Sequence, residues 1–246
     1  MTPHLLAVAM LAALVAAPLG VDAAAPDGCA VPVELQQIDV KLPHLAARLR
    51  THRPVTIVAI GGASTAGAAA GAPDLAYPAR LQKALAADFP DVAITVLNRG
   101  VARQTTQQMV ERFPRDVIAN APVLVVWETG TVDAVRGIHL DDFAAALQYG
   151  IDLLKKKAFD IILVDMQYSH HTAAVIDFEH YLETLHGVGE LDDIYVFPRF
   201  AIMRYWSEQN MFNFDGVSAD KRARLAARAY DCIARRLADA IQRAVQ

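Results

Sequence analysis

The sequence predicts an α/β protein with a three-layer α/β/α architecture around a five-stranded parallel sheet. Five short apolar runs rich in Val and Ile are typical of strands that are buried on both faces. Helical patterns separate these runs, and regular β-α alternation favours a parallel sheet covered by helices on both sides. The predicted strands are 56–60, 93–97, 123–127, 160–166 and 194–197.

Amphipathic patterns place the helices between and after these strands. The helix expected at 141–159 starts with two aspartates suited to an N-cap and ends with lysines, which suits the helix dipole. Segment 197–206, rich in aromatic residues and Arg, is expected to be a loop that packs beneath the last helix or lines a groove for sugars or acyl chains. The other expected helices are 77–89, 105–118, 175–187 and 219–245.

The first residues of the chain resemble a secretion signal. Residues 5–19 are almost wholly apolar but too short to span a bilayer comfortably, and small residues at 21–25 suit a signal peptidase. The alternative is a buried N-terminal helix. We expect a signal peptide at 1–25, an N-terminal extension at 26–54 and one domain at 55–246, in a periplasmic or secreted protein.

The composition of the mature chain argues against nucleic acid as a partner and against a membrane span. The net charge is −4, so no global field favours nucleic acid, and no later stretch is apolar enough for a membrane span. Cys29 and Cys232 are the two cysteines. In an oxidising compartment a pair near the two chain ends favours a disulfide, with a lipid anchor on Cys29 as the alternative.

A glycine-rich turn follows the first predicted strand and carries Ser64. Small residues at 61–67 let the backbone turn sharply, so a serine can stand as a nucleophile at the end of the strand. A plain β-α turn or a phosphate loop is the alternative. No Gly-Lys-Ser/Thr ending follows, and the spacing matches neither a dinucleotide fingerprint nor the nucleophile elbow of the α/β-hydrolases.

Three more motifs follow along the chain, at 98–100, 127–133 and 215–218. Together with the Ser64 turn, in this order, they resemble the four signature blocks of the SGNH/GDSL hydrolases, the flavodoxin-like serine esterase superfamily. The resemblance covers residues 55 to 246. It implies Ser64 as nucleophile, the backbone amides of Ser64 and Gly100 as oxyanion donors, Asp215 as triad acid, and no cofactor. Ser64 is expected to face a cleft.

Two positions depart from the pattern of that family. Val132 stands where the third block usually has the Asn that donates to the oxyanion, and Ser218 stands where the fourth block usually has the catalytic His. No histidine follows His186, so a small shift of the alignment does not restore the base. The catalytic set is therefore degenerate at Val132 and Ser218.

A histidine elsewhere in the chain offers a replacement base. His170 and His171 directly follow the fourth predicted strand, on the edge of the sheet where ligands bind. Either one reaches Ser64, or both line only the rim of a pocket. A metal site with Asp165 is not expected, because adjacent residues on an extended strand point in opposite directions.

Two functions from different classes remain. The first is an exported esterase that acts on O-acyl esters of cell-envelope carbohydrate or lipid, with weakened or relocated catalytic groups. The second is a binding or assembly module for envelope polysaccharide that has kept the fold and lost the chemistry. Both imply an ester or carbohydrate ligand.

Overall fold

Five parallel strands form the centre of the structure, a computed structural model that describes residues 28–214 and 216–246. The strand order is β2-β1-β3-β4-β5, and every neighbouring pair is parallel. The predicted five-stranded parallel sheet is thus confirmed. The strands are β1 (Val55–Gly61), β2 (Ile94–Gly100), β3 (Leu124–Glu128), β4 (Asp160–Val164) and β5 (Tyr195–Phe197).

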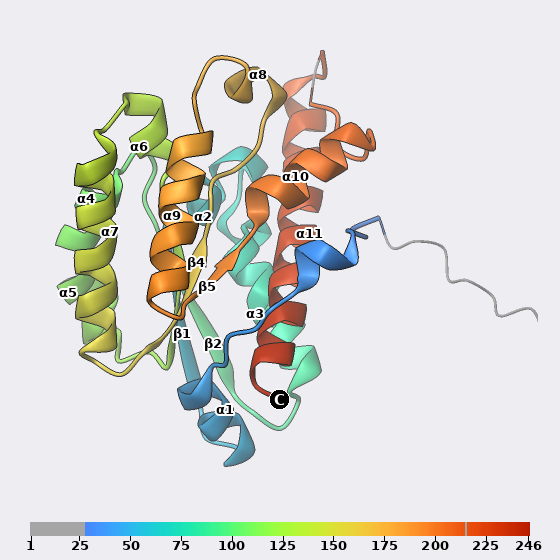
Figure 1. The fold of residues 1–246 in the computed structure, drawn as a ribbon. Helices are drawn as coiled ribbons and strands as arrows, with labels where there is room; N and C mark the ends of the chain where they lie inside the picture. The colour runs from blue at the N-terminus through green and yellow to red at the C-terminus, as the bar shows by residue number, and fades with distance from the viewer. Residues whose placement is uncertain (1–27, 215) are drawn as a thin grey trace, which may run out of the picture.

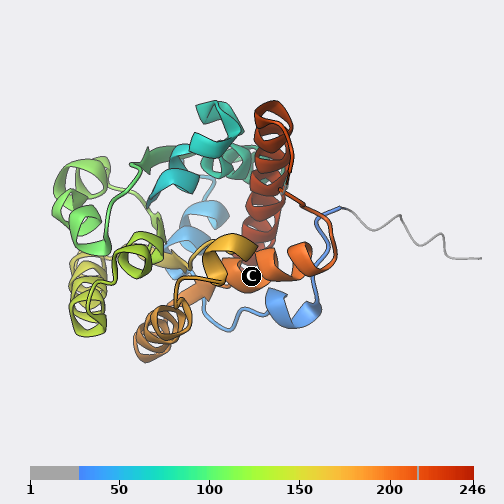
Figure 2. The same ribbon diagram turned by 90° about the horizontal axis from the view of Figure 1, so that it is seen from above.

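Helices cover both faces of the sheet, giving the three layers seen in Figures 1 and 2. Alternate strand residues enter separate cores: Ile57 and Ala59 enter one, and Val58 and Ile60 the other. The first core is closed by α1 (Pro43–Arg50), α3 (Tyr77–Asp88), α10 (Arg199–Glu208) and α11 (Ala219–Ala244). The second is closed by α4 (Thr106–Glu111), α5 (Phe113–Asp116), α7 (Leu140–Lys155) and α9 (Glu179–Leu191).

Short helices follow three strands directly. They are α2 (Ala63–Ala66) after β1, α6 (Thr131–Arg136) after β3 and α8 (His170–Ala173) after β4. Figure 1 shows α6 and α8 at one end of the molecule and α1 at the opposite end. The chain leaves β1 toward β2 on one side, and β3 lies on the other side. This reversal is the point where such sheets bind ligands. The 3-10 turns are η1 (Val33–Gln36), η2 (Ala68–Ala70), η3 (Pro73–Leu75) and η4 (Ile118–Asn120).

The helices differ from the predicted ones in three ways. The expected helix 105–118 is divided into α4 and α5, because Pro114 in the first turn of α5 cannot continue the hydrogen bonds of α4. The N-cap of α7 is His139, whose ring accepts the Asp141 N–H, instead of the aspartate pair. Segment 197–206, expected as a loop, is mostly helical because α10 begins directly after Pro198 and buries Trp206.

A disulfide joins the start of the described chain to the last helix. Cys29 and Cys232 are bridged with their Cα atoms 5.1 Å apart, which confirms the predicted pair. The Trp206 indole also donates to the Ala30 carbonyl at 3.0 Å and fixes the same segment. The expected signal peptide at 1–25 lies outside the described residues. Within the described ranges, every helix is too short or too polar to cross a bilayer.

Candidate active site

The α2 turn lies against the end of β2, as the order of the motifs predicts. Gly61 pairs in register with Gly100, which brings the first two motifs together. A Cβ on Gly100 would lie 2.2 Å from the Ala66 nitrogen, and one on Gly61 would lie 2.2 Å from Thr65 Oγ1. Neither position has room for a side chain, because the two backbones are in contact here.

Ser64 lies inside this turn and is largely buried. Only 5 % of the residue is exposed, whereas Ala63, the first residue of α2, is exposed. Little of Ser64 is therefore exposed, and the cleft that it is expected to face stays a prediction. As the second residue of α2, the serine bonds to the segment after β4.

The Ser64 hydroxyl bonds to a carboxamide. Its Oγ donates to Gln167 Oε1 at 2.8 Å. Tyr230 of α11 lies nearby, and burial together with the Glu128 charge raises its pKa to about 12, although the Ser64 hydroxyl and the Ala69 backbone oppose that shift. Because an amide oxygen accepts hydrogen bonds but does not take up a proton near neutral pH, Ser64 is not activated in this arrangement.

A buried ion pair between Glu128 and Arg199 contacts the α2 turn through Thr65. Glu128, the last residue of β3, accepts the Thr65 hydroxyl through Oε2 and pairs with Arg199 Nη1 through Oε1 at 3.2 Å. Tyr77 bonds to the same Thr65 hydroxyl at 3.2 Å, and burial raises its pKa. The sequence predicts no role of its own for Glu128 and places Arg199 in a segment expected to pack under the last helix or line a groove, not in an ion pair. A carboxylate that ends an otherwise apolar strand was the signal available.

The second motif is held by its own asparagine. Asn98 donates from Nδ2 to the Thr65 carbonyl at 2.7 Å and accepts the Gly100 N–H at 2.9 Å. The Gly100 amide is thus engaged with Asn98 in this structure. Its role as an oxyanion donor stays a prediction and requires that the amide be released or shared.

The third motif anchors α6 through a buried carboxylate. Asp133 accepts the Thr106 N–H at 3.0 Å and the Thr106 hydroxyl at 2.9 Å. Burial raises the pKa of Asp133, and these bonds oppose that shift. Val132, half-buried beside it, places no polar group at the position of the missing asparagine.

The fourth motif has a structural role at Ser218. Its hydroxyl accepts the Lys221 N–H at 3.4 Å as the N-cap of α11, a position that serine favours. Asp215, the expected triad acid, lies outside the described residues.

The candidate histidines open α8. His170 and His171 are its first two residues, and both are exposed, with ring centroids 6.2 Å apart. Gln167 precedes them by three and four residues, so the segment that touches Ser64 also carries both imidazoles. In the described ranges, no group of three or more His, Cys, Asp or Glu could hold a metal ion.

The sequence also predicts no role for His186, which contacts a buried carboxylate. His186 of α9 bonds through Nε2 to Asp165 Oδ2 at 3.0 Å, and Asp165 also accepts the Phe200 N–H at 2.7 Å. Burial raises the pKa of Asp165, and His186 opposes that shift. These contacts tie the end of β4 to α9 and to the first turn of α10.

Comparison with protein families identifies the fold. The model of the non-GDSL lipase-like family matches residues 28–246. The chain belongs to the non-GDSL lipase-like family. As expected from its motifs, it has an SGNH/GDSL-like hydrolase fold. No curated protein sequence matches it.

Solved esterase structures share this fold with the non-GDSL lipase-like chain. A mutant of Axe2, an acetyl-xylooligosaccharide esterase from Geobacillus, is 20% identical with a TM-score of 0.57, over 72% of this chain and 92% of that one. LAE5, an α/β hydrolase from the metagenome of Lake Arreo, is 17% identical with a TM-score of 0.57, over 74% and 97%. TesA is 21% identical with a TM-score of 0.54, over 70% and 93%.

Proposed function

We propose that the protein is an exported ester hydrolase that removes O-acyl groups from cell-envelope carbohydrate or lipid, with Ser64 as nucleophile. The observation that carries the proposal is the contact between Ser64 and Gln167. It brings the segment with His170 and His171 to the serine, at the edge of the sheet where related folds bind ligands. The printed activity of the Axe2 neighbour, on acetylated xylo-oligosaccharides, supports an acetyl ester as the first substrate to test.

The chemistry requires a small movement of this segment. Each residue spans at most about 3.5 Å, so the His170 Cα lies within roughly 11 Å of the Gln167 Cα and the His171 Cα within roughly 14 Å. When Gln167 leaves the hydroxyl, one of these imidazoles can take its place and accept the Ser64 proton. Oγ then attacks the ester carbon, the alcohol leaves with that proton, and water hydrolyses the acyl-enzyme.

The second candidate is a binding module without hydrolysis. It is favoured by the burial of Ser64 and by Ala63 at the exposed first position of α2, where no nucleophile is present. Val132 and Ser218 also fit this function, because neither supplies the group that the family places there.

Export is supported by the apolar segment at 5–19 and by the disulfide, because bridged cysteines persist in oxidising compartments. N-terminal sequencing of the protein recovered outside the cytoplasm tests it, and a mature chain that begins near residue 25 is expected.

Turnover of an aryl acetate and of acetylated xylo-oligosaccharide separates the two candidate functions. The hydrolase proposal expects measurable turnover that Ser64→Ala abolishes and that either His170→Ala or His171→Ala reduces at least tenfold. His180→Ala, on the exposed part of α9, is the matched control. If the native protein is inactive but binds the oligosaccharide, and Ala63→Ser gains hydrolysis, the binding module is correct.

A further inference from the structure

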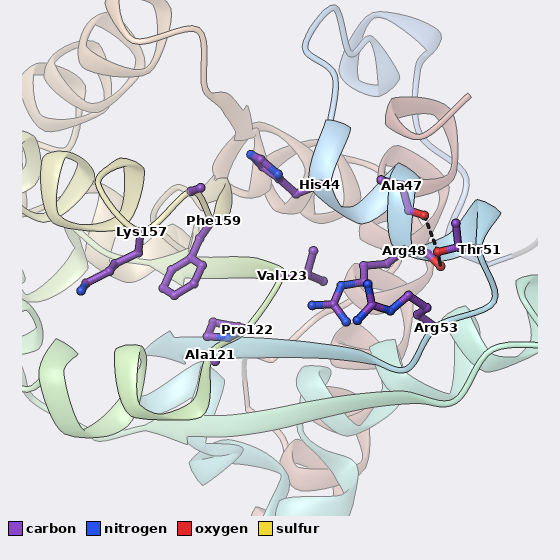
Figure 3. A pocket seen from close by; sticks show the side chains of 11 residues that line it. His44, Ala47, Arg48, Thr51, Arg53, Ala121, Pro122, Val123, Lys157 and Phe159 are labelled. Atoms are coloured by element: carbon purple, nitrogen blue, oxygen red, sulfur yellow. Dashed lines mark hydrogen bonds between the residues drawn. The ribbon is translucent and has the colours of Figure 1, made fainter.

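A basic cleft lies at the amino-terminal edge of the sheet. The cleft has a volume of about 470 Å³, within the usual range for ligand sites of roughly 300–1,000 Å³. It is formed by α1 and by the turns that precede β1, β3 and β4 (Figure 3). The α2 turn lies at the opposite edge, about 20 Å away along the seven residues of β1. The cleft is therefore separate from the candidate active site.

The charged side chains of this cleft are all basic. They are Arg48, Arg53 and Lys157, and no Asp or Glu lines the cleft. The side chains of Arg48, Arg53 and Lys157 make no hydrogen bond or ion pair with any residue in the described ranges. In Figure 3, Arg48 and Arg53 extend from one side of the cleft, and Lys157 and Phe159 come from the other.

A carboxylate next to the cleft residue Phe159 in sequence, Asp160, is already engaged. Asp160 is buried and accepts the backbone N–H groups of Leu45 at 2.8 Å and His44 at 3.3 Å, at the start of α1. It holds the helix in place and leaves the guanidinium groups without a partner. Arg48 and Arg53, which lie side by side in Figure 3, lack a protein counter-ion and so favour an external anion, and Arg suits the two oxygens of a carboxylate.

The apolar residues that line the cleft indicate which kind of molecule bears the anionic group. Phe159 is half-buried, and Pro122, Val123 and Ala47 complete an apolar wall. The C–H face of a sugar ring packs on such a wall while a ring carboxylate reaches the arginines. A membrane surface fits less well. Binding to a bilayer requires inserted apolar side chains, and none of the exposed large hydrophobic residues of the described chain lies at this cleft.

We infer that the cleft formed by α1 and the turns before β1, β3 and β4 binds a segment of acidic polysaccharide, a run of sugars that carry carboxylate groups. Such a site holds a polymer at the edge of the sheet away from Ser64. The inference does not depend on hydrolysis at Ser64.

The dipoles of nearby helices offer a competing explanation for the basic residues at the cleft. Basic residues in the last turn of a helix stabilise its carbonyl end, and α1 and α7 both end near this cleft. That explanation covers Arg48 and Arg50 alike, and of these two only Arg48 lines the cleft. It does not cover Arg53 and Lys157, which lie outside the helices.

Titration calorimetry of the full chain with oligogalacturonate, in low and in physiological salt, tests the inference. Binding is expected for this uronate and not for a neutral xylo-oligosaccharide of equal length. Arg48→Gln combined with Arg53→Gln should weaken binding roughly 10- to 100-fold, the effect of losing charge-assisted hydrogen bonds. Lysines at both positions should restore only part of it, because the fork geometry is lost.

Arg50→Gln and Lys156→Gln are the matched controls, with less than about a twofold change expected because their charges are exposed. Thermal unfolding confirms that each variant is folded. Four results would overturn the inference: no uronate binding, equal losses in the controls, equal binding of the neutral sugar, or binding of phosphatidylglycerol vesicles or inorganic phosphate in place of the uronate.

Discussion

At the scale of single residues, the state of the candidate site depends on which group accepts the hydrogen bond of the Ser64 hydroxyl. The Ser64 hydroxyl donates a hydrogen bond to Gln167 Oε1, an acceptor that does not take up the proton near neutral pH. In the mechanism proposed above, the segment 167–171 sets whether the Ser64 hydroxyl contacts the amide of Gln167 or the imidazole of His170 or His171. Gln167 is therefore the residue whose replacement is most informative.

Gln167→Glu should turn a passive contact into general-base catalysis. The new carboxylate stands where Oε1 now lies, 2.8 Å from Ser64 Oγ, and can accept the proton. General bases contribute about 10²–10⁴-fold, so aryl acetate hydrolysis should rise at least tenfold. The same change in a Ser64→Ala background should give no gain. A folded Gln167→Glu protein without increased turnover would show that the contact does not place Ser64 for attack.

Gly100→Ala should destabilise the protein by forcing the Ser64 turn away from β2. The added methyl would lie 2.2 Å from the Ala66 nitrogen, and such overpacking costs about 1–3 kcal/mol or more. Gly187→Ala on α9 is the control, since nothing lies within 4 Å of its Cβ, and it should gain about 0.5–1 kcal/mol. Urea unfolding measures both. Equal free energies of unfolding for both variants would refute the close contact.

At the scale of elements, a carboxylate joins the short helices α4 and α5. Asp116 Oδ2 pairs with Arg112 Nη1 at 2.6 Å, and Arg112 also donates to the Arg99 carbonyl at the end of β2. Bonds from Arg115 and Arg112 lower the pKa of Asp116 to about 2. The Arg112–Asp116 ion pair therefore links α4 to α5 at the point where Pro114 interrupts the helical hydrogen bonds.

The Asp116 pair should stabilise the fold above pH 4 and not at pH 2. Because its folded pKa lies below the unfolded value of 3.8, the contribution is present above 3.8 and disappears as the pH falls toward 2. A shift of this size corresponds to about 2 kcal/mol. The difference in unfolding free energy between wild type and Asp116→Asn should shrink from pH 5 to pH 2. A difference that is constant with pH would contradict the assignment.

Local patterns in the sequence predict the strands better than the helices. The apolar runs fix all five strands because burial on both faces leaves little choice of residue. The start of α10 depends instead on the contact of Arg199 with Glu128, seventy-one positions away in sequence, which no local pattern contains. In the same way, the motif order gives the place of Ser64, but its hydrogen bond to Gln167 joins residues 103 positions apart, which no local pattern contains.

At the scale of the whole molecule, the disulfide should carry a large share of the stability. It closes a loop of 203 positions, and removing a native bridge from a small exported domain costs about 2–5 kcal/mol. The double variant Cys29→Ser with Cys232→Ser should unfold at lower urea concentration than the oxidised protein. The reduced wild type should match the variant. Identical midpoints for all three would show that the bridge adds nothing.

The disulfide between Cys29 and Cys232 closes nearly the entire described chain into a covalent ring. A protease that cuts once in the exposed stretch around Asn210 would leave two pieces that stay attached through Cys29 and Cys232, and the short piece would keep α11 in its place. Such a nicked molecule would run on a gel at its full mass until a reductant is added, and only then separate into two bands. For the exported protein proposed above, in surroundings where proteases are common and reductants scarce, a single break in the backbone is thus a local opening and not the loss of a helix.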